Sequence, residues 1–423
     1  MTFALAVVAV IATLLPFGVG VFRADRVWLV VAGVVVAAAA VSVLVPRSRR
    51  ALHPALVGVT AVMLSLTAAD LALRPSGAAR VEGLRTEKLP RMPLVERFAP
   101  NAALSMHLVG DIGAMTGHPH LYEGRRLVFR SDAFGFRNDR VPDEIDLLVL
   151  ADSFGVGVVS QDETVAAQLA AQTRRRVYDL SQPRTGPWAQ YVNLLVEAPR
   201  LRFAREATVL WLLYTGNDLV DEYADVWTAD ALPWQTGIGQ RWVELDNFRA
   251  RSAVRGVITR VWHFGLESTA VPAQGRVLPN GVPFLVLAGA EHEARRPLAS
   301  VTAHANWPKL RKTLAQGAAF LARRGVAVTV IVLPTKGEVY RWLLEAREPT
   351  PDDSRSSGFA AAVLGACTEL RVRCVDAKPA LVRESRTRFA SAGELLFFRD
   401  DTHPNRAGNA VIVDVAISAL EAR

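Results

Sequence analysis

Cysteine is scarce in this sequence: only Cys367 and Cys374 occur among the 423 residues. Metal sites built on thiolates need cysteines, often with histidines, at short regular spacings, and neither cysteine belongs to such a set. The two lie close enough in sequence to form a small-loop disulfide in an oxidising compartment, but two buried free thiols fit the sequence as well. We therefore predict no metal site, and the cysteines do not indicate a compartment.

A concentrated basic patch is also missing, although the formal net charge is +8. A nucleic-acid-binding domain gathers lysine and arginine on one face or one arm. Here the arginines are scattered along the chain, with short runs only at residues 174–176 and 323–324. We therefore expect no binding to DNA or RNA.

Charge is absent from three long stretches near the N-terminus, at residues 2–22, 27–45 and 55–69. The whole sequence is 51% hydrophobic and 21% charged, which suits an apolar segment joined to a globular domain. Each stretch approaches the ~20 residues that a helix needs to cross the hydrocarbon core of a membrane. We predict an anchor of three transmembrane helices over residues 1–73, at about 2–22, 27–45 and 55–73.

A cleaved signal peptide is the alternative for the first stretch. It fits poorly because residues 1–4 (Met-Thr-Phe-Ala) carry no basic side chain and two further apolar stretches follow. The positive charges leave the orientation open, since the loop at 46–54 favours a cytoplasmic N-terminus and the basic residues after 73 oppose it. We expect a multi-pass protein of the plasma (inner) membrane.

Residues 74–124 form a polar connector without a strong period, and the pattern changes over residues 125–423. Short apolar runs then alternate with stretches of helical character. The runs lie at residues 146–151, 176–180, 207–214, 326–333, 372–376 and 395–399. Strands separated by helices of this length predict a parallel sheet covered by helices on both faces. Residues from about 221 to 300 break the alternation, and we interpret them as an insertion over the sheet edge or the site.

Polar residues follow several of these predicted strands. The segments are 152–155 (Asp-Ser-Phe-Gly), 181–186 (Ser-Gln-Pro-Arg-Thr-Gly), 215–218 (Thr-Gly-Asn-Asp) and 400–404 (Asp-Asp-Thr-His-Pro). In an open parallel sheet, ligands bind beyond the carboxyl ends of the strands, so these segments should meet at one edge. Together they supply a nucleophile, oxyanion donors, a base and a group to orient the base, which acyl transfer requires.

Each residue has a chemical role in this interpretation. Ser153 is the predicted nucleophile, and His403 is the base that takes its proton during attack. Asp400 would fix the tautomer of His403 and stabilise the imidazolium that forms. The backbone N–H groups of Ser153 and Gly186 and the side-chain amide of Asn217 would stabilise the negative charge of the tetrahedral intermediate.

Taken singly, these signals are weak. A serine after a strand-ending aspartate is often part of a helix N-cap, and an Asn-Asp pair is more often a turn. His403 is one of eight histidines. Lys336, after another predicted strand, is interpreted as a solvated lysine at a helix start and stays outside the predicted site. The joint arrangement at strand ends carries the prediction.

The segment 151–157 (Ala-Asp-Ser-Phe-Gly-Val-Gly) resembles the Gly-Asp-Ser block of the SGNH/GDSL hydrolases. Segment 216–218 (Gly-Asn-Asp) resembles their asparagine block, and Asp400, three residues before His403, resembles their C-terminal Asp-x-x-His block. This offset selects Asp400 rather than Asp401, which we interpret as solvated or as a cap.

The resemblance implies a flavodoxin-like three-layer α/β/α fold with a parallel sheet, and ester hydrolysis or acyl transfer without a metal or an organic cofactor. Residues 135–137 and 334–336 are also similar to bacterial members, so the similarity spans about residues 125–423. The sequence departs from the family pattern at Ala151, where the first glycine of the block stands, and around Gly186, which precedes a proline. These departures affect the oxyanion hole more than the nucleophile and the base.

We expect an SGNH-type serine esterase that acts on an acyl ester, with a short acyl group such as O-acetyl, of an envelope glycan or lipid. The reaction would pass through a Ser153 acyl-enzyme, and the catalytic domain would lie on the extracytoplasmic (periplasmic) side. One alternative is an O-acetyltransferase that works with a membrane partner supplying the acyl group. Another is an inactive SGNH-like module that binds glycan or scaffolds an assembly.

Overall fold

The computed structural model describes residues 86–115, 123–250, 273–278 and 283–422, together with five single positions between residues 61 and 72. The chain divides into two compact units. The first comprises Met1–Pro93 and Trp234–Ser268, and the second comprises Leu94–Pro233 and Thr269–Arg423. All of the predicted site residues belong to the second unit.

The predicted membrane anchor requires a correction. Its three helices fall almost entirely outside the described residues. Among the helices of the described part of the chain, none has the length and apolarity to cross a bilayer. The three uncharged stretches meet the length criterion for a span, but an apolar run alone does not establish that a spanning helix forms. The three-helix anchor, and the multi-pass membrane location inferred from it, are therefore withdrawn.

The described part of the first unit contains β1 (Glu87–Leu89), the start of β2 (Met92–Arg97) and α8 (Ile238–Ala250). The two strands pair as a small sheet. The side-chain amide of Asn247 on α8 donates to the carbonyl of Lys88 at 2.7 Å, and its oxygen accepts from the N–H of Lys88 at 3.2 Å. These bonds satisfy both backbone groups of an edge-strand residue and fasten α8 to β1.

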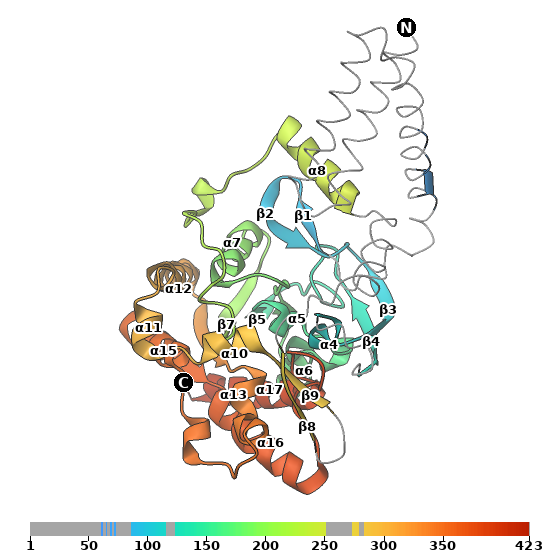
Figure 1. Ribbon diagram of the computed structural model, residues 1–423. Helices are drawn as coiled ribbons and strands as arrows, with labels where there is room; N and C mark the ends of the chain where they lie inside the picture. The colour runs from blue at the N-terminus through green and yellow to red at the C-terminus, as the bar shows by residue number, and fades with distance from the viewer. Residues whose placement is uncertain are drawn as a thin grey trace, which may run out of the picture. The chain divides into compact units, whose positions relative to one another are not determined.

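A five-stranded sheet forms the centre of the second unit (Figure 1). The strand order is β11-β10-β7-β5-β6. Its strands are β5 (Ile145–Leu150), β6 (Val177–Asp179), β7 (Phe203–Tyr214), β10 (Ala327–Leu333) and β11 (Arg373–Asp376). All neighbouring strands run parallel. Read from β6 and numbered along the chain, the order is 2-1-3-4-5, the flavodoxin-like arrangement. The α/β class and the parallel sheet are as the sequence indicated.

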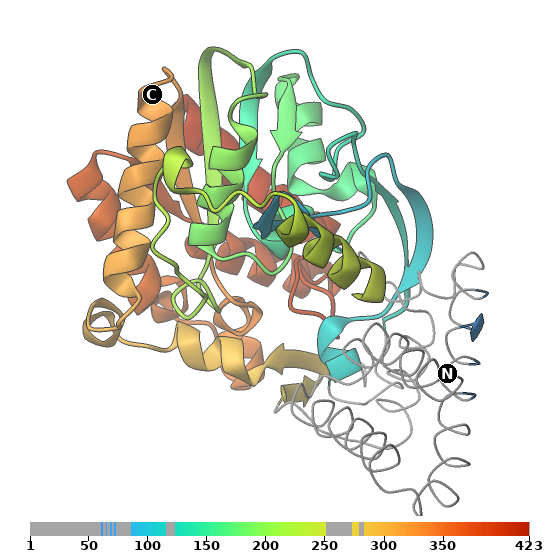
Figure 2. The same ribbon diagram turned by 90° about the horizontal axis from the view of Figure 1, so that it is seen from above.

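Helices cover both faces of this sheet (Figures 1 and 2). They are α6 (Val165–Thr173), α7 (Pro187–Glu197), α12 (Trp307–Ala322), α15 (Gly358–Leu370), α16 (Lys378–Ala392) and α17 (Arg406–Glu421). α12 packs against α7 and α15 on one face, whereas α17 packs against α6 and α16 on the other. The result is a three-layer α/β/α arrangement, and its apolar core includes Leu147 on β5, Leu210 on β7 and Val413 on α17.

The described residues also form several shorter elements. The hairpins are β3 (Ala103–Leu108) with β4 (Arg125–Arg130), and β8 (Ala273–Val277) with β9 (Pro283–Leu287). The short helices are α4 (Asp111–Met115), α5 (Ser153–Val156), α10 (Ala288–Ala294), α11 (Leu298–Thr302), α13 (Lys336–Val339) and α14 (Arg341–Leu344), with 3-10 turns at Gln161–Glu163, Ala229–Ala231 and Pro351–Ser354.

The last predicted strand, residues 395–399, does not join the sheet. It makes a single antiparallel bridge between Phe397 and Pro404. Leu396 and Phe397 are nevertheless almost fully buried in the core. The apolar run therefore reflects a buried loop rather than a sheet strand, and this loop leads directly into the Asp-Asp-Thr-His segment.

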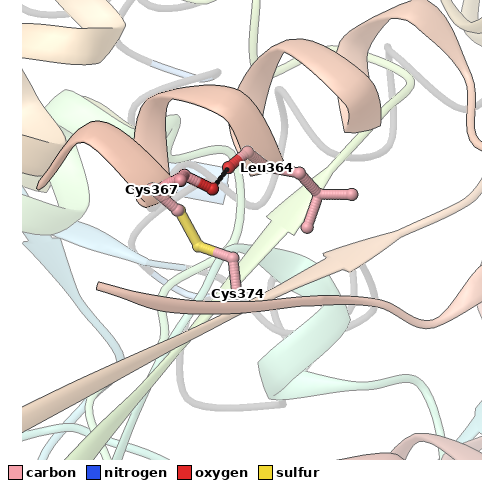
Figure 3. The surroundings of a disulfide bond; sticks show 4 residues. Leu364, Cys367 and Cys374 are labelled. Carbon is pink, nitrogen blue, oxygen red and sulfur yellow. Dashed lines mark hydrogen bonds between the residues drawn. A yellow bond between two sulfur atoms is a disulfide. The ribbon is translucent and has the colours of Figure 1, made fainter. Parts of the chain in front are cut away.

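Cys367 and Cys374 form a disulfide in this structure (Figure 3). Cys367 lies near the end of α15 and Cys374 lies on β11, so the bond ties the helix to the edge strand that follows it. This resolves the alternative that the sequence left open between a disulfide and two free thiols.

Candidate active site

The serine lies at the carboxyl edge of the sheet, directly after the buried strand β5. Asp152 is the N-cap of α5, and its carboxylate accepts from the N–H of Phe154 at 2.8 Å. Gly155 allows α5 to pack closely here, because a Cβ at this position would lie 2.1 Å from the Oγ of Ser181. Strand end, cap and close packing together place Ser153 as the first residue of a short helix.

The histidine approaches from the far end of the sequence. Its Nε2 lies 2.9 Å from the Oγ of Ser153, a contact that spans 250 residues of chain. Asn405 fixes the segment that carries it: this N-cap of α17 accepts from two N–H groups of the helix and donates to the carbonyl of Leu395 at 2.6 Å. The structure thus brings Ser153 and His403 into direct hydrogen-bond contact.

The carboxylate beside the imidazole belongs to Asp401 and not to the predicted Asp400. The Nδ1 of His403 lies 2.7 Å from the Oδ1 of Asp401, and the backbone N–H of His403 donates to the same oxygen at 3.0 Å. An offset of two residues lets one carboxylate oxygen accept both bonds within a tight turn. The interpretation of Asp401 as solvated is wrong, because only 1% of this residue is exposed.

Asp400 has a different part in the structure. Its Oδ2 accepts from the N–H of Gly110 at 3.0 Å and from the N–H of Glu123 at 2.7 Å. Its backbone carbonyl accepts from the N–H groups of Ile112 and Gly113, both at 3.0 Å. Asp400 therefore holds the start of α4 and the segment before β4 against the histidine loop, and the assignment of Asp400 as the partner of His403 is corrected.

The three predicted oxyanion donors follow β5 and its two neighbours in the sheet. Ser153 comes after β5, Gly186 is the N-cap of α7 beyond β6, and Asn217 lies in the turn after β7. Within the described ranges, no protein acceptor takes the backbone N–H of Ser153, that of Gly186 or the side-chain NH₂ of Asn217. A Cβ on Gly186 would lie 2.5 Å from the Cβ of Asp221, so glycine fits this position.

Ligand atoms of Asp111, Asp401 and His403 lie within 4.8 Å of one another and have the chemistry to hold a metal ion. Two of these atoms, however, already face each other in the 2.7 Å contact between His403 and Asp401. The guanidinium of Arg125 also contacts the other oxygen of Asp401. Both contacts compete with a metal ion for the same carboxylate.

Residues 293–423 match the family model described as "ALGX: SGNH hydrolase-like domain, acetyltransferase AlgX". These residues are thus similar to an SGNH hydrolase-like domain. The matched residues include Asp401 and His403. The match begins after Ser153, Gly186 and Asn217 in the sequence and therefore does not include them. The resemblance to the SGNH/GDSL hydrolases is therefore confirmed over this part of the chain.

Among solved structures, the crystal structure of the YXIM protein from Bacillus subtilis matches with a TM-score of 0.35 and 9% sequence identity. The match covers 76% of this chain and 75% of that chain. A similarity at this TM-score carries no argument about the function. No curated protein matches the sequence.

Neighbouring carboxylates set the protonation of His403. Burial alone lowers the pKa of His403, but Asp401, Asp111 and Asp152 outweigh it and raise this pKa to about 9. Burial raises the pKa of Asp401, but His403 and Arg125 hold it well below its ordinary value. At neutral pH the pair therefore rests as imidazolium and carboxylate, and His403 accepts a proton only after losing its own.

Lys336 is a functional candidate that the sequence interpretation placed in solvent. The residue is only 2% exposed, and its Nζ donates to the carbonyls of Phe398, Arg399 and Asp401 at 2.6, 2.8 and 3.2 Å. Burial lowers the pKa of Lys336 to about 7. Its position directly after β10, at the carboxyl edge of the sheet, is the signal in the sequence that could have identified it.

Proposed function

We propose that this protein hydrolyses an acyl ester through a covalent intermediate on Ser153. The continuous hydrogen-bonded chain from the Oγ of Ser153 through His403 to Asp401, with contacts of 2.9 and 2.7 Å, is the observation that carries the proposal. A serine hydroxyl is a weak nucleophile, and a base within hydrogen-bond distance is what activates it. The SGNH hydrolase-like domain over residues 293–423 supports the same class of chemistry.

Each proton transfer in the proposed reaction has a defined donor and acceptor. The Oγ of Ser153 attacks the ester carbonyl while its proton passes to the Nε2 of neutral His403, and Asp401 stabilises the imidazolium. The N–H groups of Ser153 and Gly186 and the amide of Asn217 are the proposed donors to the oxyanion of the tetrahedral intermediate. When the intermediate collapses, the leaving alkoxide takes the proton from His403. Water then attacks the acyl-enzyme by the same steps and releases the acid.

The proposal extends to the acyl group and to the molecule that carries it. The matched family model is named after an acetyltransferase, so we propose acetyl as the acyl group and a glycan or lipid hydroxyl as its bearer. If such a hydroxyl, and not water, attacked the acyl-enzyme, the same residues would perform transfer. A partner protein would then supply the acyl group.

A fluorophosphonate probe tests the proposal directly, because it reacts covalently with activated serines. We expect the full-length chain to be labelled, and Ser153→Ala and His403→Ala to lose labelling and turnover of an activated acetyl ester by a factor on the order of 10⁶. Ser391→Ala, which changes an exposed serine of α16, is the matched control and should be labelled like the wild type. A well-folded wild type that is neither labelled nor active would refute the proposal.

The products of acetyl ester turnover distinguish hydrolysis from transfer. Acetate released into water at a rate independent of added sugar or lipid acceptors supports the hydrolase. An acetylated acceptor formed in preference to free acetate would replace hydrolysis by transfer, with Ser153 and His403 in unchanged roles.

A further inference from the structure

Arg125 connects the two segments that carry the nucleophile and the base. This first residue of β4 directs its guanidinium at the loop of Asp401, where one terminal nitrogen donates to the Oδ2. The Nε of the same guanidinium donates to the carbonyl of Val158 at 3.1 Å. Val158 lies just beyond Gly157, the residue that ends the short helix starting at Ser153.

The two oxygens of the Asp401 carboxylate thus have different partners. Oδ1 accepts from the ring and from the backbone N–H of His403. Oδ2 accepts from Arg125, and the backbone N–H of Asp111 lies 3.3 Å from it. A carboxylate held at both oxygens cannot rotate about its terminal bond without losing a charge-assisted hydrogen bond.

The surroundings of Arg125 hold the guanidinium in this orientation. Its side chain is 11% exposed, and its central carbon lies 3.8 Å from the ring centroid of Phe398. A terminal nitrogen lies 3.7 Å from the Oδ1 of Asp400, so the cation faces two adjacent carboxylates. The planar fork of arginine, which a lysine lacks, allows these contacts and the bond to Val158 at the same time.

We propose that Arg125 is a positioning residue of this site, which keeps the Oδ1 of Asp401 directed at His403 and fixes the distance between the histidine loop and the serine turn. The inference rests on the proposed function, because it assigns Arg125 a role in the reaction of Ser153. The positive charge of the guanidinium also disfavours the protonated form of His403 and so lowers its pKa. It therefore counteracts the carboxylates of Asp401, Asp111 and Asp152, which favour the protonated histidine.

The comparison of Arg125→Met with Arg125→Lys separates the charge from the geometry. Arg125→Met should lower kcat by about 10–100-fold with little change in KM, because a displaced base costs rate more than binding. It should also move the acid limb of the pH–rate profile upward, by less than the roughly 1–3 units caused by a charge in direct contact. Arg125→Lys restores the charge but not the fork, so the acid limb should return to its wild-type position while kcat recovers only in part.

Arg126→Met is the matched control, because Arg126 is the next residue of the same strand and its exposed Nε donates to Ser105. This variant should have the wild-type rate, pH profile and thermal unfolding temperature. If Arg125→Met does not fold, Arg125→Lys still tests the geometric role through its lower kcat. A wild-type rate and pH profile in a folded Arg125→Met would overturn the proposal.

An NMR titration of the His403 ring keeps this inference separate from the proposed function, because it needs no turnover. A higher pKa of His403 in Arg125→Met than in the wild type supports the positioning role even if no ester is cleaved. The contrary result is an Arg125→Met variant with the same His403 pKa and the same low-field Nδ1 proton signal as the wild type. If the fluorophosphonate still labels the wild type, that result refutes the role of Arg125 and leaves the proposed function intact.

Discussion

Replacing Asp401 by asparagine tests the assignment of the orienting carboxylate. The Oδ1 of Asp401 accepts from His403, and its Oδ2 accepts from Arg125. An asparagine amide has one oxygen and one NH₂ group, so either orientation places a donor against a donor. If the NH₂ faces His403, the imidazole must carry its proton on Nε2, and that tautomer cannot take the proton of the serine.

The expected loss is large for Asp401 and small for its neighbour. In serine hydrolases, an asparagine that imposes the wrong tautomer lowers kcat by a factor of about 10⁴. Asp400→Asn is the matched control, because the bonds from Gly110 and Glu123 reach a single oxygen that an amide also provides. We expect Asp400→Asn to keep kcat and to lower the free energy of unfolding by about 1–2 kcal/mol, since its two bonds lose their charge.

The assay is the initial rate on an activated acetyl ester, with far-UV circular dichroism and thermal unfolding to verify that both variants fold. A loss of rate confined to Asp401→Asn supports the reasoning. A folded Asp401→Asn with the wild-type rate, or a rate lost only in Asp400→Asn, would refute it and return the role to the residue three positions before the histidine.

Four further predictions concern buried groups. The pKa of His403, raised to about 9, predicts that kcat/KM increases with pH up to a limb near that value, as a pH–rate profile would show. The ion pair stabilises the folded state fully below about pH 6.5, the ordinary histidine pKa, so the free energy of unfolding should fall as pH rises from there through about 9, which denaturant titrations at both ends would detect. Lys336→Met should lower both the rate of fluorophosphonate labelling and the unfolding temperature, whereas Lys378→Met, which removes a buried lysine paired with Glu338, should lower only the temperature. Cys367→Ser opens a short loop and should reduce the free energy of unfolding by about 2–3 kcal/mol, and an equal stability of variant and wild type under oxidising conditions would contradict the disulfide.

The sheet was predictable because its strands are buried on both faces. β5, the second half of β7 and β10 are nearly continuous apolar runs in the sequence, which is what a covered parallel sheet requires. The run at 395–399 has the same composition for a different reason, since Leu396 and Phe397 fill the core from a loop. An apolar run indicates that a segment is buried. Whether the segment is a strand or a loop depends on the hydrogen-bond partners of its backbone, and the sequence does not show these.

The site was predictable as far as strand ends determine it. Ser153 and Asn217 follow strands closely in the sequence. Ligands of a parallel sheet bind at the carboxyl ends of its strands, and this rule is sufficient to predict that both residues lie at that edge. The choice between Asp400 and Asp401 depends on the turn in which they lie, because adjacent residues point in different directions there. Arg125 contacts that turn from a hairpin that is remote in sequence, so no local pattern marks it.

The charge balance around the histidine explains why a permanent cation lies next to Asp401. The neighbouring carboxylates favour an imidazolium, which is the form of His403 that cannot act as a base. Lys336 opposes them only while it is protonated, and burial lowers its pKa to about 7. The guanidinium of Arg125 contacts Asp401, and arginine side chains in general are charged throughout the pH range in which histidines titrate. Lys336, in contrast, is already neutral at the pH near 9 where His403 titrates, so the effect of Arg125→Met on the pKa of His403 should be the same in Lys336→Met as in the wild type.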